Sequence, residues 1–196
     1  MVTQPIQHPT ATVPSSWLKR YYFTRFAFSA AWVVIAVSVA GSVPALAAIL
    51  LVGYSAWDAI ANFIDGQRSG SLIHNRSQQL NVIFSLLTAL AVAVALGSGL
   101  HSVLIVFGIW AGFSGIFQLT TAVGRWKSFG AQWVMILSGA QSALAGVFMI
   151  SVARGPDPVG IANIAPYAAF GAFYFAVSAL WLTVSDIRKD RLRTAG

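Results

Sequence analysis

Asp58 is the one acidic residue inside the long apolar stretches of this sequence. Tyr54, Ser55, Asn62 and Asp65 lie three, four or seven positions from it, which places all five residues on one side of a helix. An ionised carboxylate is costly in hydrocarbon unless it faces a partner, water or another helix. The spacing therefore predicts an intramembrane polar site of Asp58, Tyr54, Ser55 and Asn62 that faces the bundle interior or a pocket connected to the cytoplasm.

Three glutamines, Gln118, Gln132 and Gln141, lie in other apolar stretches. Amides in lipid join helices through hydrogen bonds, and they can also line a polar path. We add Gln118 to the candidate polar site. The choice between a structural and a functional role stays open for these amides and for Asp58.

The residue types that catalysis and metal binding need are scarce. The sequence has no Glu and no Cys, and the Asp residues other than Asp58 lie in predicted loops or the C-terminal tail. We expect His101 on the opposite side of the membrane from His8 and His74, so the three histidines would not share a metal ion. Because no pair of carboxylates and no nucleophile with a base is visible, we expect no enzymatic activity, no cofactor and no metal.

The composition is that of a membrane protein. Hydrophobic residues make up 57% of the 196 residues and charged residues 9%, whereas a soluble domain has about 25% charged residues. The apolar residues fall into six stretches near the ~20 residues that cross a bilayer. We predict an all-α integral membrane protein with six transmembrane helices at Phe23–Val43, Pro44–Ile64, Leu80–Gly97, Leu100–Val123, Ala131–Val152 and Ile164–Val184.

The basic residues predict the orientation. Of twelve Lys and Arg residues, all except Arg154 lie on the side that holds both termini, including Lys19 and Arg20 before the first stretch and Arg25 at its start. The excess of Lys and Arg on the inner side predicts that both termini are cytoplasmic. The net charge of +7 then favours contact with anionic lipid headgroups over nucleic-acid binding. A second copy of the chain and another membrane protein also stay open as partners.

This topology divides the chain into three parts. Residues 1–22 are expected to form a cytoplasmic tail, disordered over 1–14, and an interfacial segment; residues 23–184 the transmembrane domain; and residues 185–196 a basic cytoplasmic tail. A signal peptide cleaved near Ala47 is the alternative for the N-terminus, because small residues flank that position. Cleavage would leave an odd number of helices, so we keep the first helix.

Short turns group the six helices into three predicted hairpins that resemble one another. In each pair the second helix runs from a glycine near an aromatic residue, at Gly53, Gly108 or Gly171, to a basic exit. Three hairpins built from a repeated unit are the architecture we predict. Small residues also share faces of the fourth and fifth helices, which predicts close packing there or a path along those faces. These residues are Gly108, Gly112 and Gly115, and Gly139, Ser142 and Gly146.

The fourth and fifth stretches also resemble a known family. The segments GIWAGFSGIFQL at 108–119 and WVMILSGAQSALAG at 133–146 are similar to the repeated pattern of HdeD-type bacterial membrane proteins, and Pro44 and Gly53 fit the same repeat. The resemblance covers 23–184 and implies a multi-pass protein of the bacterial inner membrane, with a link to acid resistance in one branch and no transferable chemistry. We therefore expect a stress-related or structural role. The alternative is a small transporter or channel with Asp58 as a proton or cation site.

Overall fold

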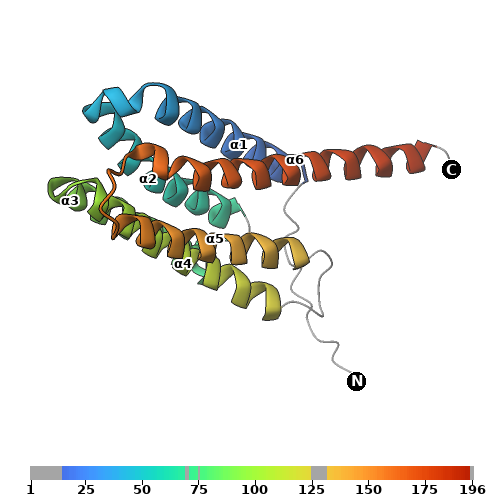
Figure 1. Ribbon diagram of the computed structural model, residues 1–196. Coiled ribbons are helices and arrows are strands. Elements are labelled where there is room, and N and C mark those ends of the chain that lie inside the picture. The colour runs from blue at the N-terminus through green and yellow to red at the C-terminus, as the bar shows by residue number, and fades with distance from the viewer. Residues whose placement is uncertain (1–14, 69–70, 75, 125–131, 195–196) are drawn as a thin grey trace, which may run out of the picture.

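The computed structural model describes residues 15–68, 71–74, 76–124 and 132–194, and this part of the chain is helical without a strand (Figure 1). Six long helices are each apolar enough to cross a membrane. The prediction of an all-α protein with six such helices is confirmed for the described residues. The helices are α1 (Ser15–Ser38), α2 (Pro44–Arg68), α3 (Arg76–Ala95), α4 (Leu100–Gly124), α5 (Gln132–Ala153) and α6 (Ala165–Thr194).

Short 3-10 turns reverse the chain. Three of them, η1 (Ala40–Ser42), η3 (Leu96–Ser98) and η4 (Ile161–Asn163), lie at one end of the bundle, which we call the turn end. Pro44 opens α2 at a position where the missing N–H costs nothing. Gly99 has a φ of 102°, which glycine adopts without strain, and it separates η3 from α4.

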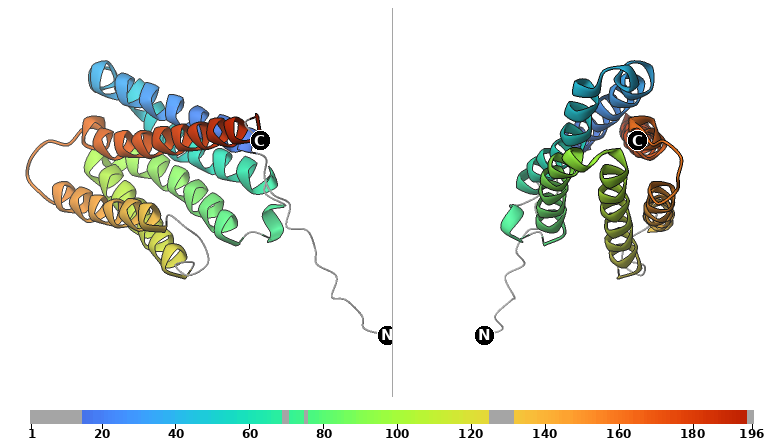
Figure 2. Two further views of the ribbon diagram at one scale, coloured as in Figure 1. Left: turned by 90° about the vertical axis from the view of Figure 1, so that its right-hand side faces the viewer. Right: turned by 60° about the vertical axis from the view of Figure 1, so that its left-hand side comes forward.

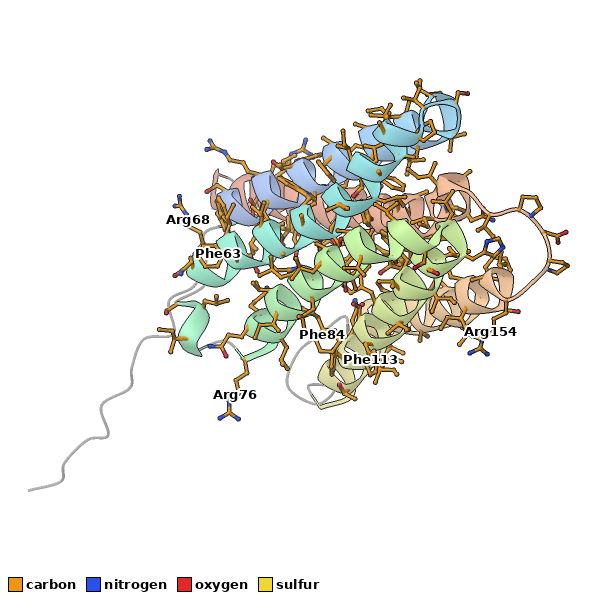
Figure 3. The ribbon with its side chains drawn as sticks, turned by 90° about the vertical axis from the view of Figure 1, so that its left-hand side faces the viewer. Phe63, Arg68, Arg76, Phe84, Phe113 and Arg154 are labelled. Carbon is orange, nitrogen blue, oxygen red and sulfur yellow. The ribbon has the colours of Figure 1, made fainter. Side chains whose placement is uncertain are left out.

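The opposite end, which we call the basic end, carries η2 (Leu72–His74), the start of α1 and the end of α6. Arg68 and Arg76 lie at the basic end and Arg154 at the turn end (Figure 3). The two ends therefore differ in charge in the direction that the sequence predicts. The cytoplasmic location of the basic end stays a prediction, and residues 1–14 lie outside the described residues.

The first and last helices extend furthest beyond their predicted bounds. The first begins at Ser15, not Phe23, and the last continues to Thr194, not Val184, so that its final turns project beyond the bundle (Figure 1). Neither 15–38 nor 172–194 contains Gly or Pro, so nothing in the backbone stops the helix where its apolar part ends. Hydropathy marks the membrane-crossing part of a helix and misses such extensions.

The helices pack in an alternating pattern. The largest interfaces join α4 with α5, α1 with α6, and α2 with α3, while those of α3/α4, α1/α2 and α5/α6 are smaller. Figure 2 shows the α5–α6 connection as a wide loop and the two helices set apart. The smaller interfaces are the ones within the predicted hairpins, so the packing gives no evidence for hairpin repeats, which stay a prediction.

The α4/α5 interface depends on glycine. A Cβ atom at Gly146 would lie 2.5 Å from the carbonyl oxygen of Gly108 and 2.6 Å from the backbone nitrogen of Gly112. Gly115 and Gly139 face each other in the same way, and Ser142 Oγ donates to the Ala111 carbonyl oxygen at 2.9 Å. Gly112 contributes only its backbone, because a Cβ there would meet no atom within 4 Å. Such close backbone contact stabilises the α4/α5 interface, because bulky apolar side chains gain little free energy by leaving lipid for a helix interface.

Large apolar side chains fill the turn end. Leu51, Val92 and Phe107 are fully buried there, each on a different helix. Trp32 joins α1 to α2 by donating from Nε1 to the Leu50 carbonyl oxygen at 2.8 Å. The outer surface also carries large apolar side chains, including Phe63 and Phe113 (Figure 3). A surface of this kind suits contact with acyl chains.

Candidate functional site

A cleft of about 590 Å³ lies inside the bundle, and all six helices contribute side chains to it. Its floor is formed by the rings of Tyr54, Trp110 and Tyr167, from α2, α4 and α6. Trp110 packs edge-on against both tyrosines, with ring centroids 6.1 Å from Tyr54 and 5.9 Å from Tyr167. From this aromatic layer the cleft extends toward the basic end, where Asn62, Gln78 and Asn81 line it.

Asp58 lines the cleft and takes hydrogen bonds from three helices. Arg25 of α1 forms an ion pair with its Oδ1 atom. Asn62 of α2 donates to Oδ2 at 2.8 Å, and Ser85 of α3 donates to the same oxygen at 2.7 Å. The side chains of Arg25 and Asp58 are 11% and 17% exposed. The intramembrane carboxylate is thus neutralised and fully hydrogen-bonded, which offsets its desolvation.

Arg25 extends this network to α6. Its Nη1 atom donates to the Tyr21 hydroxyl at 2.9 Å, and its guanidinium carbon lies 4.3 Å from the ring centroid of Phe175. A cation over an aromatic face is attracted by the ring quadrupole. Its Nε atom is buried and has no acceptor in the described part of the chain. The Arg25–Asp58 pair therefore connects α1, α2, α3 and α6.

Arg25 and Ser85 belong to the site but were not predicted from the sequence. Arg25 counted among the basic residues at the start of the first stretch, whereas α1 begins earlier and holds Arg25 within its membrane-crossing part. The absence of Gly and Pro from 15–38 was the signal for this earlier start. Ser85 carried no signal, because only the packing of α3 against α2 brings it to Asp58.

The other residues of the predicted polar site lie in different surroundings. Tyr54 lines the cleft from within an aromatic cluster, with its ring centroid 4.9 Å from that of Trp32. Gln118 lines the cleft from α4. Ser55 is buried and donates to the Val52 carbonyl oxygen of its own helix at 3.2 Å, and it does not line the cleft. Asp65 accepts from Gln78 Nε2 at 2.6 Å, nearer the basic end.

The remaining polar side chains of the cleft are of two kinds, those that bridge two helices and those without a hydrogen bond to the described part of the chain. Gln141 Oε1 accepts from the Tyr174 hydroxyl at 2.7 Å, and the hydroxyls of Ser142 and Tyr167 lie 3.4 Å apart, so both Gln141 and Ser142 bridge α5 and α6. The side chain of Gln132 lies outside the described residues. Polar side chains that line the cleft without a hydrogen bond to the described part of the chain are Asn81, Ser114, Gln118, Ser138 and Ser178.

The groups that the cleft offers to a ligand are mainly uncharged polar groups and aromatic rings. Its lining is made of amides, hydroxyls and aromatic rings, with Arg25 and Asp58 as the charged side chains. Within the described residues no three His, Asp, Glu or Cys side chains come close enough to hold a metal ion. The arrangement is suited to holding an uncharged polar molecule by hydrogen bonds and ring contacts.

Part of the chain is similar to a known protein family. Residues 81–151 match a family described as a short repeat of unknown function (DUF308), to which HdeD-type proteins belong. The matched stretch runs from α3 through α4 into α5 and includes the glycine interface. Neither a curated protein nor a solved structure matches the chain. The similarity thus supports a multi-pass membrane protein and assigns no role to any residue.

Proposed function

We propose that this protein is a small transporter or channel of the bacterial inner membrane, with both termini in the cytoplasm and a polar solute bound in the central cleft. The observation that carries the proposal is the set of amides and hydroxyls that line a cleft between all six helices and have no hydrogen bond to the described part of the chain. Polar groups inside a membrane are costly, so they are found mainly where helices join or where a solute passes. Five polar side chains of the cleft form no hydrogen bond between described helices: Asn81, Ser114, Gln118, Ser138 and Ser178.

Asp58 has a different role in this proposal from that of a free proton or cation site. Arg25 occupies one carboxylate oxygen, and Asn62 and Ser85 occupy the other. A cation would have to displace the guanidinium from a poorly hydrated position before it could bind. We therefore assign Asp58 to holding four helices around the cleft, and the solute to the uncharged side chains.

A structural or stress-related role is the second candidate, favoured by the match to the short-repeat family. The close glycine packing of α4 on α5 falls inside the matched residues. This candidate needs no solute in the cleft. We propose no enzymatic activity under either candidate.

Solute flux through reconstituted vesicles separates the two candidates. Vesicles holding the full chain are exposed to osmotic gradients of glycerol and of urea, and swelling is followed by light scattering. We expect faster swelling than in protein-free vesicles. The variant Ala145→Phe fills the cleft and should slow swelling, whereas Leu144→Phe, on the lipid-facing side of the same helix, should leave it unchanged. Wild-type swelling no faster than in protein-free vesicles for both probes would overturn transport and leave the structural role.

A further inference from the structure

We infer that the Arg25–Asp58 ion pair makes the cleft selective for uncharged, hydroxyl-bearing solutes of polyol or sugar type. The inference deepens the proposed function and rests on it. It assigns a substrate class to the cleft and a selectivity role to two residues that could otherwise be regarded as purely structural.

The described side chains that line the cleft carry no net charge. Arg25 and Asp58 are the charged side chains among the described residues that line it, and they neutralise each other. A solute with a net charge would leave water without gaining a countercharge, because both charges already have their partners. An uncharged solute loses much less hydration on entry. The cleft should therefore exclude ions of either sign.

The remaining lining indicates what kind of uncharged solute fits. Hydroxyl and amide groups of Asn81, Ser114, Gln118, Ser138 and Ser178, on α3, α4, α5 and α6, have no hydrogen bond to the described part of the chain and can donate to and accept from a solute. The rings of Tyr54, Trp110 and Tyr167 line one side of the cleft and offer apolar contacts there. A polyol chain or sugar ring presents many hydroxyls together with apolar C–H faces, which match these two surfaces. The volume of about 590 Å³ falls within the range of small-molecule sites.

The absence of cysteine makes the inference measurable without background labelling. Ser114→Cys places one thiol in the cleft at a side chain with no hydrogen bond in the described part of the chain. The rate of its reaction with a maleimide is measured in the presence of three probes that share a linear six-carbon chain: sorbitol, which is uncharged, N-methylglucamine, a cation, and gluconate, an anion. We expect sorbitol to protect the thiol at a concentration at least about tenfold lower than either ion.

Removing either charge of the pair should shift the preference of the cleft toward an ion of the opposite sign to the charge that remains. Asp58→Asn leaves Arg25 unpaired and should make gluconate the best protector, while Arg25→Gln leaves Asp58 unpaired and should favour N-methylglucamine. The double variant Arg25→Gln/Asp58→Asn is again neutral and should prefer sorbitol. The matched control is the ion pair between Lys19 and Asp186 of α1 and α6, with an N–O distance of 2.8 Å, which does not line the cleft. Lys19→Gln should leave the preference for sorbitol unchanged.

The outcomes distinguish this inference from the proposed function. Equal protection by all three probes in the wild type overturns the inference and leaves solute binding standing. Glycerol or urea flux that depends on Ala145, without protection by sorbitol, also overturns the substrate class alone. Absence of both flux and protection overturns both. If either single variant fails to fold, the wild type and the double variant still decide, because an ion preference in either one contradicts charge selection by the pair.

Discussion

The turn end and the basic end of the same six helices are built in different ways. At the turn end Leu51, Val92 and Phe107 are fully buried between the helices. Toward the basic end the helices surround a cleft lined by amides, hydroxyls and one ion pair. One set of helices therefore provides close apolar packing at one end and a polar cleft toward the other. The aromatic layer of Tyr54, Trp110 and Tyr167 lies where the apolar packing gives way to the cleft.

The fifth helix shows the same contrast on its two sides. Toward α4 it packs backbone against backbone through Gly139 and Gly146. Toward α6 it has few direct contacts, and the side chains of Gln141 and Ser142 bridge the space. Close packing therefore fixes one wall of the cleft, while hydrogen bonds hold the other wall. Substitutions in the two kinds of contact should have effects of different size.

Gly146→Leu should have the largest effect, the loss of folded protein. Its Cβ alone would lie 2.5 Å from a backbone oxygen of α4, an overlap that no side-chain rotation relieves. The measurement is the yield of monodisperse protein after solubilisation. Gly112→Ala is the control, since a methyl group there meets no atom within 4 Å and should be tolerated. Wild-type yield and thermal stability for Gly146→Leu would show that α4 and α5 do not approach this closely.

Arg25→Gln should be the next most damaging change, at about 3–5 kcal/mol, because it leaves the Asp58 carboxylate buried without a countercharge. Adding Asp58→Asn should recover most of the loss, since the double variant buries no charge. Thermal unfolding in detergent gives the comparison. Lys19→Gln breaks a more exposed ion pair and should cost no more than about 1 kcal/mol. Equal costs for the two pairs would contradict the difference in burial.

Ser85→Ala should cost about 1.5–3 kcal/mol, because it removes a hydrogen bond to a charged acceptor on another helix. Thr88→Ser, one turn further along α3, is the control, because its hydroxyl can keep the bond to the Phe84 carbonyl oxygen of the same helix. Denaturant unfolding of both variants measures the difference. A loss no larger for Ser85→Ala than for Thr88→Ser would mean that Ser85 does not support Asp58.

Ser114→Ala should have the smallest effect on stability, within about 0.5 kcal/mol, because the hydroxyl has no partner in the described part of the chain. The same change should weaken solute binding, since it removes a hydrogen-bonding group from the cleft. Unfolding and glycerol flux are measured on the same preparation. A marked loss of stability with unchanged flux would indicate that Ser114 supports packing, as residues at the turn end do.

Much of the fold was predictable, because hydropathy and the Gly and Pro residues that end helices act locally along the chain. The length of the apolar stretches indicated six helices, and Pro44 and Gly99 lie at helix boundaries in both sequence and structure. The helix ends at Ser15 and Thr194 were missed, because hydropathy reports where a helix leaves the bilayer and not where its backbone hydrogen bonds end. The site was partly predictable, since Asp58 and Asn62 lie one turn apart on one helix.

Residue types and their spacing were enough to predict six helices long and apolar enough to cross a membrane, and a carboxylate at Asp58 that needs a partner, because an isolated charge is costly in hydrocarbon. The identity of the partners, Arg25 and Ser85, follows from the packing of the helices, since these residues lie 33 and 27 positions from Asp58 in the chain. The tertiary structure also decided that Gly112 packs through its backbone alone and that side chains from all six helices meet in one cleft. Such contacts depend on which helix faces lie together, and in lipid that choice follows from close packing and hydrogen bonding between helices, which a local pattern indicates only in part, as the small residues of α4 and α5 do.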